Sequence, residues 1–139
     1  MKLDIDTHTH TVLSGHAHST LLENILFAKK KGLSGIVVTD HSGGMKGVQS
    51  ASCVGLLRDV PQEYDGIRIY RGTETNIVNE KGEVDLPLRY LQFVEFAIAS
   101  MHDNVICSVD QAHDTDAMIG ALNNPYIDII GHPGNPFFK

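Results

Sequence analysis

Histidine is unusually frequent in this sequence, and its positions follow a pattern that could bind metal ions. The 139 residues include eight histidines, and imidazole is the commonest metal ligand in proteins. Two of them, His8 and His10, are separated by one residue. Because residues two apart in a strand point to the same face, both side chains could reach a single ion. The candidate ligands are His8, His10, His16, His41, Glu74, His102 and His132.

Five predicted strands would position these ligand-type side chains. The strands are expected at residues 3–6, 35–39, 67–70, 96–100 and 126–130. Each is followed within a few residues by a candidate ligand. In parallel sheets and barrels, active-site residues gather at the C-terminal ends of the strands. Five consecutive strands that all end this way indicate a metal site rather than a set of independent structural histidines.

Helical segments are expected between the strands. Thr20 to Glu23 has the pattern of a capping box, and the helix that it opens should end at Gly32. Thr115 is expected to cap a later helix that runs to about Asn123. The other segments are a helix candidate at 51–60, a glycine-rich loop at 42–47 and a hairpin turn at 79–82. This alternation of strand and helix predicts an α/β fold, an incomplete (β/α) barrel or a related parallel sheet.

Length, charge and cysteine content limit the classes of protein to consider. With 42% hydrophobic residues, the chain can form one core, so one domain over residues 1–139 is expected. The net charge of −6 argues against a general binder of nucleic acid or anionic membranes. Cys53 and Cys107 are expected to be free thiols in a reducing compartment. Without a signal-peptide pattern or a membrane-length apolar run, a cytoplasmic protein is expected.

Imidazole and carboxylate ligands without thiolates indicate a hydrolytic metal site rather than a structural zinc site. They suit Zn²⁺, Mn²⁺ or Fe²⁺. Seven ligands exceed the four of one tetrahedral site, and the two oxygens of Glu74 could bridge two ions. Clustered ions can clamp a phosphoryl group and supply a metal-bound hydroxide. Ser14 is rejected as a nucleophile, because no carboxylate-oriented His–Ser pair is evident and a metal hydroxide needs no serine.

Several polar residues near the candidate ligands have more than one interpretation. Asp6 and Asp40 could orient ligand imidazoles from behind, or make structural hydrogen bonds at strand ends. Asn76 could contact substrate or brace its loop. Three basic residues are candidates for holding a substrate phosphate, namely Lys46, Arg58 and Arg71. The two histidines outside the ligand pattern, His18 and His113, are expected at the surface.

Taken together, these motifs resemble those of the PHP family, named for polymerase and histidinol phosphatase. The motifs are His8-Thr9-His10 with Ser14 and His16, Thr39-Asp40-His41, Gly72 to Asn76, Met101-His102 and Gly131 to Pro136. The resemblance covers the whole chain and is closest to the stand-alone, YcdX-like bacterial phosphatases of the family. It implies that the chain is the N-terminal portion of a PHP domain, with the first five strands of a distorted seven-stranded barrel.

The resemblance also implies a trinuclear metal centre with a particular division of the ligands. One ion would take His8, His10 and Glu74, a second His16 and His41, and a third Glu74, His102 and His132. Members of the family are phosphatases or phosphoesterases, while PHP domains attached to DNA polymerases can act as proofreading nucleases or be inactive. The family's last motif, Asp-x-His, has no counterpart in these 139 residues.

The leading functional prediction is metal-dependent hydrolysis of small phosphate esters by a metal-bound hydroxide, with up to three Zn²⁺, Mn²⁺ or Fe²⁺ ions. One alternative is a nuclease-type phosphodiesterase, which the acidic charge and the lack of tryptophan disfavour. The other is a non-catalytic metal-binding or interaction module, because the last ligands are missing. Five strands cannot close a barrel, so a further C-terminal segment or self-association is expected to complete it.

Overall fold

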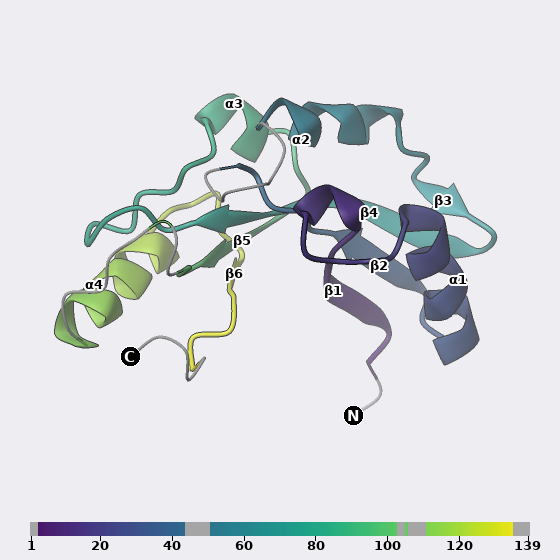
Figure 1. Ribbon diagram of the computed structural model, residues 1–139, viewed down its shortest axis with the longest axis horizontal. Helices are drawn as coiled ribbons and strands as arrows, with labels where there is room; N and C mark the ends of the chain where they lie inside the picture. Colours follow the sequence, from purple (N-terminus) through teal and green to yellow (C-terminus); the bar gives the residue numbers. More distant parts are fainter. Residues whose placement is uncertain (1–2, 44–50, 103–104, 106–110, 135–139) are drawn as a thin grey trace.

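Five parallel strands form a curved sheet in the computed structural model, which describes residues 3–43, 51–102, 105 and 111–134. In spatial order they are β1 (Ile5–Thr9), β2 (Gly35–Val38), β4 (Ile67–Asn76), β5 (Phe96–Ser100) and β6 (Ile129–Ile130). Each strand therefore pairs with the next parallel strand along the chain, as in a (β/α) barrel. Within the described residues β1 and β6 do not pair with each other, so the barrel is open. The predicted α/β incomplete barrel is confirmed (Figure 1).

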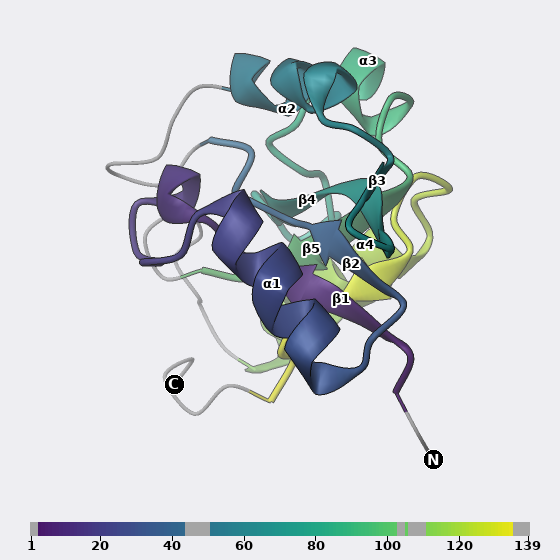
Figure 2. The ribbon, with the colours of Figure 1, turned by 90° about the vertical axis from the view of Figure 1, so that its right-hand side faces the viewer.

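Helices cover one side of this curved sheet. They are α1 (Leu21–Lys31), α2 (Ser52–Leu56), α3 (Leu88–Leu91) and α4 (Gln111–Leu122), together with two short 3-10 turns, η1 (Val12–Ser14) and η2 (Leu57–Asp59). In Figure 1, α1 lies to the right of the strands, α2 and α3 above them and α4 to the left, and Figure 2 shows α1 in front of β1 and β2. None of the helices in the described ranges combines the length and apolar character needed to cross a bilayer.

Helix α1 has the boundaries that the sequence predicts. The Thr20 hydroxyl accepts a hydrogen bond from the Glu23 amide at 3.3 Å, and the Glu23 carboxylate accepts one from the Thr20 amide at 2.7 Å, so the capping box is complete. The helix ends at Gly32, whose φ of 71° is in the left-handed region that favours glycine. Its inner face packs on β2 and β4 through a cluster formed by Ile25, Ala28, Ile36, Val38, Ile67 and Ile69.

Helix α4 begins earlier than predicted. It starts at Gln111, so Thr115 lies inside the helix and the prediction that Thr115 caps it was wrong. Asp114 lies in the first turn, where its charge complements the helix dipole. Ala117 and Ala121 on the inner face are fully buried against β5 and the loop that follows β4.

Strand lengths also differ from the predictions, except for β5, which matches. β1 is displaced toward the ligands, β6 keeps only two residues, and β4 is ten residues long. A short strand β3 (Glu63–Tyr64), antiparallel to β4, was not predicted, nor was α3. The predicted hairpin turn at 79–82 is confirmed, because Ile77 and Val84 pair antiparallel on either side of it.

The long strand β4 joins the two halves of the sheet. Its residues 68–71 pair with β2, whereas residues 72–76 pair with β5. Neighbouring strands are therefore strongly staggered, as the tilt of strands in a barrel requires. Because of this stagger the C-terminal half of β4, which carries Glu74, lies between the ends of β2 and β5.

Gly120 of α4 offers a test of how closely the 79–82 turn packs on that helix. A Cβ at Gly120 would overlap the backbone of Lys81, which cannot move as a flexible side chain could. We predict that Gly120→Ala lowers the free energy of unfolding by about 2 kcal/mol. Gly55→Ala in α2 is the matched control, because a Cβ there meets only the Tyr90 ring at 3.5 Å. Urea unfolding should show G55A unchanged or slightly stabilised, and equal stability of the two variants would contradict the packing.

Candidate metal centre

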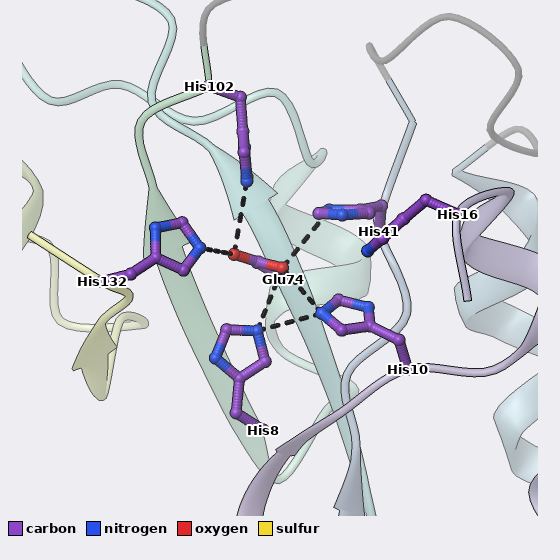
Figure 3. Close-up of a pocket in the computed structure, with 7 residues that line it drawn as sticks. All are labelled: His8, His10, His16, His41, Glu74, His102 and His132. Carbon is purple, nitrogen blue, oxygen red and sulfur yellow. Dashed lines mark hydrogen bonds and ion pairs between the residues drawn. The ribbon is translucent and has the colours of Figure 1, made fainter. Parts of the chain in front are cut away.

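All seven predicted ligands line one open pocket at the C-terminal ends of the strands. The pocket has a volume of about 500 Å³ and is lined by His8, His10, His16, His41, Glu74, His102 and His132. Figure 3 shows their side chains pointing toward one another, with His16 coming from the loop after the η1 turn and the others from the strands or the residues that follow them. Residues far apart in the sequence are thus brought together as the strand pattern predicts.

Glu74 lies at the centre of this group with its side chain 1% exposed. Its Oε2 faces His8 Nε2 at 3.1 Å, His10 Nε2 at 3.1 Å and His41 Nδ1 at 3.5 Å. Its Oε1 faces His132 Nε2 at 2.9 Å and His102 Nε2 at 3.5 Å. Five imidazole nitrogens therefore converge on the two oxygens of one carboxylate (Figure 3).

The surrounding imidazoles hold Glu74 in its ionised form. Burial has the largest single effect and raises the pKa of the Glu74 carboxyl, but hydrogen bonds from His10, His102 and His8 together outweigh it and hold that pKa well below its usual range. The same hydrogen bond to Glu74 raises the pKa of His8, against the opposing effect of burial. Protons on the imidazoles thus balance the buried charge, a role that metal cations can also fill.

His41 provides the observation that best tests whether a metal fits. Its Nδ1 is buried and has no hydrogen-bond partner among the described residues. Burial lowers the pKa of His41 to about 4, so the ring is neutral at neutral pH, which is the form that coordinates metals. A buried nitrogen without a partner is costly. A cation between His41 and Glu74 would satisfy it, so the residues present fit a metal site.

An irregularity in β1 positions the His8 and His10 pair. The register between β1 and β2 shifts between Asp6 and Thr9, which leaves one extra residue in β1. Thr9 is fixed beyond the shift, because its amide donates to Thr39 Oγ1 at 3.0 Å. Bulges of this kind redirect side chains beside active sites. Here the two rings meet with 3.0 Å between their Nε2 atoms.

Ser14 supports the ligands from behind. Its hydroxyl donates to Asp40 Oδ1 at 2.6 Å, so it must accept from His10 Nδ1 at 2.9 Å. Nδ1 of His10 therefore carries a proton, and Nε2 is left to face the pocket. The Ser14 hydroxyl also lies 3.3 Å from the His41 amide, which donates to it. On the sequence alone, Ser14 is rejected as a nucleophile and is part of the first motif without an assigned role. Its position four residues after His10, across the η1 turn, was the signal that was missed.

Asp40 and Asp6 differ in which of their two predicted roles they take. Asp40 accepts from Ser14 and from the amide and hydroxyl of Thr11, so it acts on His10 through Ser14. Asp6 accepts from the backbone amide of His8 at 3.2 Å and not from its ring. Asp6 therefore makes the structural hydrogen bond at the strand end, whereas Asp40 helps to orient a ligand.

Asn76 is a brace in this structure. Its side chain is fully buried, its Oδ1 accepts from His102 Nδ1 at 2.6 Å, and its Nδ2 donates to Gly43 O at 2.8 Å. It is not among the residues that line the pocket, and a contact with substrate stays a prediction. The alternative prediction, a loop brace, describes its contacts.

Two of the three basic residues considered for phosphate lie away from the pocket. Arg71 pairs with Glu95 at 3.3 Å and Arg58 with Asp59 at 3.6 Å, and neither lines the pocket. Lys46 and Cys107 lie outside the described residues. The two remaining histidines, His18 and His113, are exposed, as predicted.

The turn that carries His132 has an unusual backbone. His132 has a φ of 30°, a value rare outside glycine. A Cβ on the preceding Gly131 would overlap the Ser100 hydroxyl and approach Glu74 Oε1 at 3.4 Å, so only glycine fits there. Strained backbone of this kind is found where a functional group must be held in place. Here it brings the His132 ring to Glu74.

Three overlapping groups of donor atoms could each hold an ion. They are His10, His16 and His41; His8, Glu74 and His132; and His41, Glu74 and His102, each with its donor atoms within 4.8 Å of one another. Nitrogen and carboxylate donors without sulfur suit Zn²⁺, Mn²⁺ or Fe²⁺. The groups divide the ligands differently from the family resemblance, which placed His8 with His10. The division among ions therefore stays a prediction.

Replacing Ser14 should weaken metal binding without changing a ligand. Ser14→Ala removes the acceptor that holds the proton on His10 Nδ1, so we predict that zinc affinity falls by about 10–100-fold. Competition with a chromophoric chelator measures this affinity. Ser34→Ala is the control, because the Ser34 hydroxyl donates to Asp4 at the other end of the sheet and is not in the pocket lining. Unchanged affinity in S14A would refute the positioning role.

Comparison with known proteins places this site in a family. Residues 6–132 match the PHP domain. A probable phosphatase of Caldanaerobacter subterraneus is 46% identical over 139 residues, which are 99% of this chain and 55% of the relative. Probable phosphatases of a Thermoanaerobacter species and of Vibrio vulnificus are 48% and 42% identical over 99% of this chain, and over 57% and 55% of their own lengths. The chain thus spans a little over half the length of these relatives, and it belongs to the PHP family.

Proposed function

We propose that this chain supplies most of the metal centre of a metal-dependent phosphatase acting on small phosphate monoesters. The observation that carries the proposal is the convergence of five imidazole nitrogens on the ionised, buried carboxylate of Glu74. The relatives that share 42–48% of its residues are named probable phosphatases, which supports the same chemistry here.

The ions would be Zn²⁺, Mn²⁺ or Fe²⁺, up to three in number. The residues that would hold them are His8, His10, His16, His41, Glu74, His102 and His132. Bound ions would supply Lewis-acid chemistry, neutralising phosphate oxygens and lowering the pKa of water so that hydroxide attacks phosphorus in line at neutral pH. Any ligands corresponding to the family's Asp-x-His motif would come from residues outside these 139 or from a second chain.

The chain's own residues would bind the ions and orient the phosphate. Glu74 provides a permanent negative charge that can be shared between two ions, and neutral His41 provides a lone pair at the buried side of the pocket. His132, with a side chain 36% exposed, lies on the open side, where a phosphate would enter. Among the described residues no lysine or arginine lines the pocket, so the ions themselves would neutralise the phosphate on this side.

Removal of metal and replacement of Glu74 together test this function. We predict that hydrolysis of an aryl phosphate is abolished by chelation and restored by Mn²⁺ or Zn²⁺. Glu74→Gln keeps the shape of the side chain but removes its charge, so kcat/KM should fall by at least about 100-fold, the upper end of the loss for a residue that merely supports a ligand. Glu95→Gln, which alters a partly buried carboxylate paired with Arg71 away from the pocket, is the control and should retain activity.

Other outcomes would favour the alternatives. Cleavage of a single-stranded oligonucleotide with no turnover of the aryl phosphate would support a nuclease-type phosphodiesterase. Stoichiometric metal binding with neither activity would support a non-catalytic metal-binding or interaction module. A chain that binds no transition metal would contradict all three.

A further inference from the structure

Asp85 lies behind the pocket rather than in its lining, immediately after the returning arm of the 77–84 hairpin. It is held beside β4 because its amide donates to Asn76 O at 3.1 Å. We propose that Asp85 is a positioning residue that acts through Asn76 to keep a proton on His102 Nδ1, which leaves His102 Nε2 free to coordinate a metal. The metal part of this inference rests on the proposed function, whereas the position of the proton does not.

The contacts of Asp85 determine which way the Asn76 amide is turned. Asp85 Oδ2 accepts from Asn76 Nδ2 at 2.5 Å, and Asp85 Oδ1 accepts from the Asn76 backbone amide at 2.9 Å. An ionised carboxylate only accepts hydrogen bonds, so the nitrogen of the Asn76 side chain must face it. The second N–H of that side chain goes to Gly43 O at 2.8 Å, another group that only accepts. Both amide protons are therefore used, and the amide oxygen must point the other way.

That oxygen fixes the proton on His102. Asn76 Oδ1 lies 2.6 Å from His102 Nδ1, and since an amide oxygen cannot donate, Nδ1 must carry the hydrogen. In the neutral ring the lone pair is then on Nε2, the atom 3.5 Å from Glu74 Oε1. A metal-ligating histidine commonly donates its other N–H to a carboxylate, carbonyl or water. Here the donor chain runs from His102 to Asn76 and from Asn76 to Asp85.

The same carboxylate also reaches the loop after β2. Ser42 donates its hydroxyl to Asp85 Oδ1 at 2.9 Å, and the Ser42 amide donates to Glu74 O at 3.1 Å. Ser42 follows His41 directly in the chain. Asp85 therefore connects the segments that carry His41, Glu74 and His102, which is more than a residue stabilising its own hairpin would need to do.

The unaltered chain provides the first test. Long-range ¹H–¹⁵N spectra of the metal-free protein distinguish the two neutral tautomers of each histidine from each other and from the ring that is protonated on both nitrogens. The His102 signals are assigned by their loss in His102→Gln. We expect the Nδ1–H form, and an Nε2–H form would overturn the proposal. This measurement on the unaltered chain tests the proposal even if a variant of Asp85 does not fold. It needs no substrate, so its result can be interpreted even if the phosphatase proposal fails.

Asp85→Asn provides the second test. The variant keeps the shape of Asp85, but its new NH₂ group would face Asn76 Nδ2, so two donors oppose each other. If the Asn76 amide turns over to relieve this, it gives up its hydrogen bond to Gly43 O and presents its NH₂ to His102, and the proton moves to Nε2. We expect that change of tautomer together with a loss of zinc affinity of about 10–100-fold.

Asp128→Asn is the matched control, because Asp128 likewise accepts a backbone hydrogen bond, from the Ala97 amide at 2.9 Å, without contacting the pocket. It should retain the Nδ1–H tautomer of His102 and the zinc affinity of the unaltered chain. Retention of both properties in D85N would overturn the proposal. An equal loss of affinity in D85N and D128N would also overturn it, because a general loss of stability would then account for both.

Discussion

The buried charge of Glu74 is the constraint on which the rest of this structure depends. A carboxylate that is 1% exposed must be compensated by donors or cations, because burying an unpaired charge is very costly. β4 places this carboxylate between the ends of β2 and β5. The strands β1 and β6 form the two edges of the sheet. Each of these four strands leads to at least one imidazole directed at Glu74 (Figure 3). Because β4 is the middle strand, imidazoles from the strands on both of its sides can reach Glu74 and compensate its charge.

Around this centre the hydrogen bonds are arranged in two similar chains. One runs from His10 through Ser14 to Asp40, and the other from His102 through Asn76 to Asp85. In both, a neutral hydroxyl or amide stands between the imidazole and a carboxylate. This separation keeps the outer negative charges away from the pocket while still setting the direction of each hydrogen bond in the chain. Nδ1 of His10 and of His102 is thereby kept protonated, and Nε2 is the nitrogen of each ring that faces Glu74.

The sequence was sufficient to predict the elements whose signals are local. The capping box at Thr20 and the apolar run of β5 depend only on nearby residues, and both were predicted correctly. The ligands could be recognised as a set because only a few side chains bind metals, and these follow one strand after another. The ten-residue length of β4 and the start of α4 before Thr115 depend on which strands and helices pack together. No local pattern contains that information.

The supporting residues were harder to predict for a chemical reason. A metal ligand must be one of a few residue types, whereas the group behind it can be any hydroxyl, amide, carboxylate or carbonyl. Ser14 and Asn76 become recognisable only when the partner on their far side is known, because that partner decides whether they accept or donate. The partner of Asn76 is Asp85, which follows the second strand of the 77–84 hairpin. The sequence predicted the turn of this hairpin without assigning the hairpin a role. In this protein the identity of the candidate ligands is thus encoded locally, while the proton positions on their rings are set by tertiary contacts.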